Sequence, residues 1–91
     1  MSEPTREAPT VFDHIAVLLD QMAAVAWQKL GLQPDMVTGQ IEPNLEQARV
    51  AIDVVSFLAG KLEDQLDEDD RRHVQSLVRD LKINFVQKGG A

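Results

Sequence analysis

The stretch from Val11 to Leu30 constrains the fold more than any other part of the sequence, because apolar side chains cover most of its helical circumference. Only four residues between positions 12 and 27 are polar, namely Asp13, His14, Asp20 and Gln21. At about 100° per residue these four fall on one side, so an isolated helix would expose a wide apolar surface. We therefore expect this helix to be covered from more than one side, by the rest of the chain or by a second copy.

Capping residues predict where this helix begins and ends. Thr10 offers an N-cap, and Asp13 in the first turn places a negative charge at the positive end of the helix dipole. Gly31 suits a left-handed C-cap, because glycine enters that conformation without a side-chain penalty. The helix should therefore end at Leu30.

Two further helices follow from the same kinds of signal. Asn44 with Gln47 forms a capping-box pattern at the start of the second helix, and Asp67 can cap a third helix over residues 68–86 that ends before Gly89 and Gly90. The second segment carries apolar residues at alternating spacings of three and four, and the third carries an apolar stripe on one side of the helix. The two stripes are Leu45, Ala48, Ile52, Val55, Ala59, Leu62 and Leu66 in the second helix, and Val74, Leu77, Val78, Leu81 and Phe85 in the third.

Residues 31–43 contain two prolines and two glycines, which predicts a long loop between the first and second helices. A loop of this length is either functional or held in place by its own side chains. We favour the structural interpretation, in which apolar side chains pin the loop across the helix ends. The residues expected to do so are Leu32, Met36, Val37 and Ile41.

No pattern in the sequence is typical of an active site or a metal site. There is no cysteine, His14 and His73 lie far apart, and the acidic run 63–70 lacks the central glycine of a calcium loop. Asp53 is the strongest acidic candidate, with Arg49 one turn earlier as its expected ion-pair partner. We therefore predict no enzymatic activity, cofactor or metal, and expect that a three-helix core leaves little room for a pocket of about 300 Å³.

Charge is distributed unevenly along the chain, whose net charge is −6. Residues 1–70 hold four bases against fourteen acids, net −10, whereas residues 71–91 hold five bases against one acid, net +4. On a helical wheel, four bases share the half of the third helix away from its apolar stripe: Arg71, Arg72, Arg79 and Lys82. We expect this basic face to contact acidic surfaces of the same fold or of another subunit. The alternative is an acidic ligand or nucleic acid, which the net charge and the lack of interleaved aromatic residues disfavour.

The two ends of the sequence are predicted to be flexible. Residues 1–10 form a polar, proline-containing tail, and residues 88–91 a short glycine-rich one. The first residues are acidic where a signal peptide would be basic and then apolar, and Asp20 with Gln21 interrupts the best candidate for a membrane span. We expect a cytoplasmic protein that does not cross a membrane.

The sequence also resembles, in order and spacing, a bacterial family known as domain of unknown function 1844, over residues 12–86. The resemblance rests on Phe12, Leu30-Gly31, Pro34-Asp35, Thr38-Gly39, Leu45, Ala48, Ile52-Asp53, Leu58, Lys61, Leu66, Leu77, Leu81-Lys82 and Phe85-Val86. The segment 61–66 departs from the family pattern, as does Arg79, which stands where an aromatic residue is expected. The resemblance implies a small cytoplasmic bacterial protein and assigns no activity to it.

Together the residues predict an all-α fold over residues 11–87, with a first helix, a long loop and a hairpin of two further helices, completed by self-association. The predicted role is a non-enzymatic interaction module that forms a homo-oligomer or binds another protein. The alternative is a small-ligand or nucleic-acid binding protein that uses the 31–43 loop or the basic face. The expected interface consists of Leu18, Leu19, Met22, Val25, Trp27 and Ile83.

Overall fold

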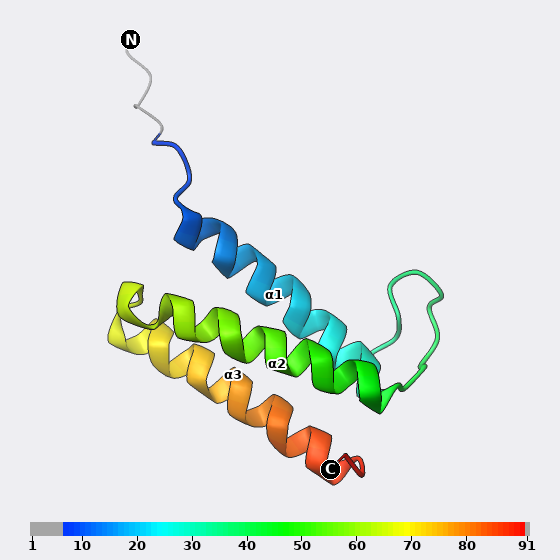
Figure 1. Cartoon of the computed structure of the whole chain (residues 1–91). Helices are drawn as coiled ribbons and strands as arrows, with labels where there is room; N and C mark the ends of the chain where they lie inside the picture. Colours follow the sequence, from blue (N-terminus) through cyan, green and yellow to red (C-terminus); the bar gives the residue numbers. More distant parts are fainter. Residues whose placement is uncertain (1–6, 91) are drawn as a thin grey trace.

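The computed structural model describes residues 7–90 and contains three helices and one short turn of 3₁₀ helix. In chain order these are α1 (Val11–Lys29), α2 (Leu45–Leu62), η1 (Glu63–Gln65) and α3 (Glu68–Gln87). Figure 1 shows α2 lying between α1 and α3, with the loop that joins α1 to α2 extending away from the helices. The all-α prediction is confirmed, and residues 7–90 contain no strand.

Each helix begins at the capping residue that the sequence predicts. Thr10 and Asp13 form a reciprocal capping box, in which the Asp13 amide donates to the Thr10 hydroxyl and the Thr10 amide donates to the Asp13 carboxylate. Asn44 accepts from the Gln47 amide, and Asp67 caps α3 in the same manner. The second cap is simpler than predicted, because only the Asn44 side chain takes part in it.

The C-terminal end of α1 is closed by two backbone hydrogen bonds around Gly31. The Gly31 amide donates to the Gln28 carbonyl and the Leu32 amide to the Trp27 carbonyl, which is the Schellman arrangement. This arrangement requires the left-handed φ of 81° that Gly31 adopts. Gly31 also lies against Pro43, so the C-terminal end of the loop packs against the C-terminal end of α1, where the loop begins.

The core lies mainly between α1 and α2, which make the most extensive helix contact. Small side chains on both helices are buried there, among them Ala23 and Ala26 of α1 and Ala48 and Ala51 of α2. Small residues allow two helix backbones to approach closely, and the surrounding larger side chains fill the space on either side. Helix α3 adds one fully buried large side chain, Leu81.

The three helices form an open arrangement. The radius of gyration is 15.6 Å, whereas a compact domain of this length has a value of about 12 Å. Because α2 occupies the middle position, α1 and α3 each have one neighbour along most of their length (Figure 1). Their outer faces are therefore free to contact another molecule. None of the helices in residues 7–90 combines the length and apolar character needed to cross a bilayer.

The loop between α1 and α2 is held by Asp35 and not by its apolar side chains. The Asp35 carboxylate accepts hydrogen bonds from the amides of Val37, at 2.7 Å, and Thr38, at 3.0 Å. In the backbone, the Asp35 amide donates to the Gln40 carbonyl and the Gly39 amide donates to the Asp35 carbonyl. The prediction that apolar side chains pin the loop was wrong. Met36 and Val37 are 85% and 94% exposed, because the turn closes on itself with polar groups and directs these two side chains outward.

Asp35 gives the loop an expected pH dependence. The amides of Thr38 and then Val37 stabilise the carboxylate and hold the pKa of Asp35 below its ordinary value of 3.8. Because the folded pKa is the lower one, this stabilisation is complete above about pH 4 and is lost as the pH falls through the folded pKa. We expect NMR titration to show the Val37 and Thr38 amide shifts following the Asp35 carboxyl. Asp35→Asn keeps the acceptor oxygen and should abolish that titration, whereas an Asp35 carboxyl titrating at or above 3.8 would contradict the assignment.

Candidate functional site

A stripe of exposed apolar side chains runs along the outer side of α1. It consists of Val11, Leu18 and Val25, and we call it the α1 stripe. Residues seven apart lie within about 20° of one another on a helix, so the three form one continuous line. Leu18 is 51% exposed although it lies in the middle of the helix. No other element in the described part of the chain covers this line.

The structure divides the residues predicted to form the interface into four groups. Leu18 and Val25 belong to the α1 stripe, while Met22 and Trp27 are half-buried and pack against the core. Leu19 is only 2% exposed, because it faces α2 inside the molecule, and so it is not available to a partner. Ile83 is exposed but lies on α3, beside a different feature.

That feature is a surface groove of about 380 Å³ between α2 and α3. The apolar residues that line it include Ala59, Leu66, Val74 and Val78. The expectation that a three-helix core leaves little room for a pocket of about 300 Å³ concerned the interior, and this groove lies outside it. The space lies between two neighbouring helices at the surface, where small side chains on α2 leave it unfilled, and not inside the core.

A second hollow of about 210 Å³ continues the groove toward the end of α3. Arg49, Ile52 and Asp53 of α2 line it together with residues of α3, and Lys82 lines both spaces. On α3 the two spaces extend from position 71 to position 86, which corresponds to about 22 Å at 1.5 Å per residue. The combined groove is therefore long and open.

The bases predicted to form one basic face have separate roles in the structure. Arg71 donates from Nε to the Glu63 carbonyl, at 3.0 Å, and from Nη2 to the Leu66 carbonyl, at 3.1 Å. It thereby ties the start of α3 to the turn that ends α2. This contact is not visible in the helical-wheel pattern, because it depends on how the η1 turn folds back beside α3.

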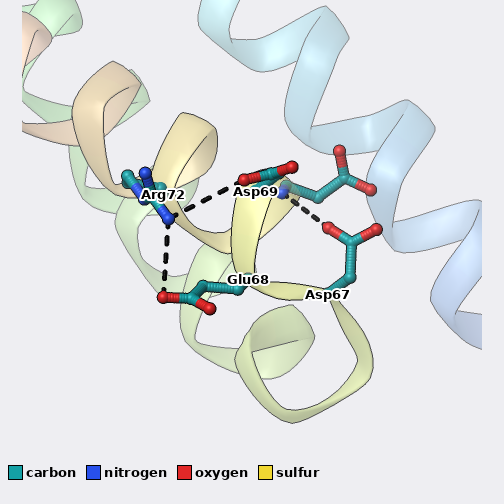
Figure 2. Close-up of polar contacts among 5 residues, drawn as sticks. Asp67, Glu68, Asp69 and Arg72 are labelled. Carbon is teal, nitrogen blue, oxygen red and sulfur yellow. Dashed lines mark hydrogen bonds and ion pairs between the residues drawn. The ribbon is translucent and has the colours of Figure 1, made fainter.

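Arg72 lies outside the groove and belongs to an acidic cluster at the start of α3. Its guanidinium is 3.4 Å from the Glu68 carboxylate and 3.7 Å from that of Asp69, next to the cap made by Asp67 (Figure 2). All these side chains are exposed, so the pairs add little to stability. They show that the acidic run serves the helix start, as the sequence predicts.

Arg79 and Lys82 are therefore the bases of α3 that remain available at the groove. Arg79 contacts its own helix, with Nη2 3.3 Å from the Ser76 hydroxyl and Nε 4.0 Å from the Asp80 carboxylate. Within residues 7–90 no ion pair involves Lys82. The groove thus has an apolar lining with bases on its α3 side and one acid, Glu63, at the η1 turn.

Asp53 lies at the opposite edge, on α2. The predicted ion pair with Arg49 is not among those found in residues 7–90, although both side chains line the same hollow. The described residues also contain no group of three or more acidic or histidine side chains arranged to hold a metal. The arrangement offers charge and apolar contact to a partner.

The model of one protein family matches residues 12–87, and its description is domain of unknown function, DUF1844. The chain belongs to the DUF1844 family. Searches of curated proteins and of solved structures found no match. The family resemblance noted from the sequence is thereby confirmed, and it covers all three helices and the loop.

Several features of the DUF1844 resemblance have structural roles in this fold. Leu30-Gly31 forms the end of α1, and Asp35 with the Thr38-Gly39 pair forms the closed turn of the loop. Sequence reasoning did not identify the groove. Its signal was the pair Ala59-Gly60 in α2, since two small residues in succession cannot fill the space beside a neighbouring helix.

Proposed function

We propose that this DUF1844 protein is a non-enzymatic helical module that self-associates in the bacterial cytoplasm through the α1 stripe. The observation that carries the proposal is the continuous line of Val11, Leu18 and Val25 on the outer side of α1. An exposed apolar surface of this kind is typical of protein–protein contact sites. The lack of cysteine agrees with a reducing, cytoplasmic location.

A two-fold contact between two α1 stripes explains why this surface is apolar. In such an isologous pair each residue is used twice, once from each copy. Full burial of an exposed leucine or valine side chain contributes about 1.5–3 kcal/mol, and the stripe residues can gain the fraction of this that corresponds to their remaining exposure. Burial of the stripe from both copies therefore favours association, against the entropic cost of binding. The open shape of the single chain supports the proposal, since α1 has only one neighbour within the molecule.

Sedimentation velocity of two charge-introducing variants tests this proposal. Leu18→Glu places a carboxylate in the middle of the α1 stripe, and we expect it to weaken association at least about tenfold. Val17→Glu is the matched control, because Val17 is 55% exposed but lies about 100° away around the helix. It should keep the mass of the wild type. Equal masses for wild type and Leu18→Glu, at every concentration, would overturn the proposal.

A further inference from the structure

The outer side of α2 carries a second row of exposed side chains, which we call the α2 crest. It consists of Glu46, Val50, Asp53 and Phe57, whose spacings of four, three and four place them on one face of the helix. Phe57 is 64% exposed and Val50 60% exposed. Val50 lies between the two carboxylates, whereas Phe57 has Asp53 on one side and Lys61 on the other, with the Lys61 Nζ 5.2 Å from the centroid of the Phe57 ring. No other helix in residues 7–90 covers Val50 or Phe57.

We propose that the groove between α2 and α3 receives the α2 crest of a second copy of this chain. The crest extends from position 46 to position 57, or about 16 Å, and the groove with its adjoining hollow extends about 22 Å along α3. The lengths are therefore compatible. An open, elongated groove suits a helix better than a small molecule, which is usually enclosed on most sides.

Gly60 supports the approach of another helix at this groove. It lies in the last turns of α2, where glycine is unfavourable compared with alanine. A Cβ atom built on Gly60 would meet nothing within 4 Å, so the packing of the single chain does not require glycine there. Because Gly60 has no side chain, the α2 backbone is exposed at this point of the groove. An aromatic side chain of the second copy, such as its Phe57 ring, can therefore contact that backbone.

The charges of the two surfaces are complementary. The groove is lined by the bases Arg71, Arg79 and Lys82 and by one acid, Glu63, so it is net positive. The crest has carboxylates at Glu46 and Asp53 and one base beside Phe57, Lys61, so it is net negative. Opposite charges at the rim of an interface select the partner and its orientation. The uneven charge of the sequence, negative up to residue 70 and positive after it, is thereby matched between two copies.

The positions of crest and groove allow a closed dimer. Asp53 belongs to the crest and also lines the hollow, and Phe57 lies next to Ser56, which lines the groove. Since the two features adjoin, a two-fold axis between them places each crest in the groove of the other copy. This contact uses α2 and α3 and leaves the α1 stripe free. It rests on the proposed self-association and adds a second surface to it.

Charge reversal on both sides of the contact tests the proposal. We expect Asp53→Lys and Lys82→Glu each to weaken self-association at least about tenfold, measured by sedimentation velocity in about 0.15 M salt. An equimolar mixture of the two variants should regain the wild-type mass, because the mixed dimer contains only opposite charges. Such a rescue is intermolecular by necessity. Lys88→Glu is the control for Lys82→Glu, because it changes the net charge by the same amount at a residue that does not line the groove. It should keep the wild-type mass.

Gly60→Leu provides a second test that does not depend on charge. Leucine favours the helix and fills the groove, so the variant should melt at or above the wild-type temperature and yet associate at least about tenfold more weakly. If Gly60→Leu and both charge reversals keep the wild-type mass while Leu18→Glu lowers it, the crest contact is wrong and the α1 contact stands. A wild type that is monomeric at every concentration overturns both.

Discussion

Replacing Leu81 with alanine is expected to lower the free energy of unfolding by about 2–5 kcal/mol. Leu81 is the one large side chain of α3 that is fully buried in the described core, where it packs with residues of the other helices. Truncation removes its buried methyl groups and leaves a cavity that the rigid α1–α2 pair cannot close. Because α3 makes the smaller helix contact with α2, it should detach first.

Ile83→Ala is the control for this variant. Ile83 lies two residues further along α3 and is exposed, so its truncation should cost less than about 1 kcal/mol in the monomer. Urea unfolding followed by far-ultraviolet circular dichroism, which reports the helix content of α3 as well as of α1 and α2, measures the stability of both variants at about 1 µM, where association adds little to stability. Equal losses for the two variants would show that Leu81 does not anchor α3.

Replacing Ala48 with leucine is expected to destabilise the fold by about 1–3 kcal/mol. Ala48 is fully buried within the core shared by α1 and α2. A leucine there forces the helices apart or drives its own side chain into a strained rotamer, although leucine itself suits a helix. The destabilisation arises from overpacking and not from a change in helix propensity.

Val50→Leu separates these two causes. Val50 lies two residues further along the same helix with its side chain exposed, so the change should stay within about 0.5 kcal/mol of the wild type. Both variants are compared by urea unfolding under the same conditions. An Ala48→Leu variant as stable as the wild type would mean that α1 and α2 are not in close contact at this position.

The helix boundaries could be predicted from the sequence because the signals that set them are local. Thr10, Asn44 and Asp67 act within three residues of their own position, and Gly31 acts through its own backbone conformation. The starts of the three helices and the end of α1 follow from these contacts. These boundaries can be predicted without knowing how the helices pack against one another. Leu66, expected on the stripe of the second helix, lies beyond it, because α2 ends at Leu62 and is followed by the η1 turn.

The orientation of α1 could not be predicted in the same way. Its apolar residues surround most of the helix, so periodicity does not distinguish the side with Leu19 from the side with Leu18. The choice is made by Ala23 and Ala26, which allow α2 to approach closely and bury Leu19 beside them. Leu18 is left on the outside for the same reason.

The groove and the role of Arg71 depend on contacts between distant parts of the chain. The groove exists because small residues of α2 lie beside α3, and Arg71 reaches carbonyls of the preceding turn. The loop shows that hydrophobicity alone does not predict which of its side chains are buried. Hydrophobicity suggested that Met36 and Val37 hold it in place, but the Asp35 hydrogen bonds close the turn without them.

Sedimentation equilibrium of the wild-type protein shows whether a second copy covers the surfaces that the single chain leaves exposed. At about 100 µM in about 0.15 M salt we expect a mass at least twice that of the 10.1 kDa chain, decreasing on dilution into the low micromolar range. A mass of 10.1 kDa at every concentration would contradict the account.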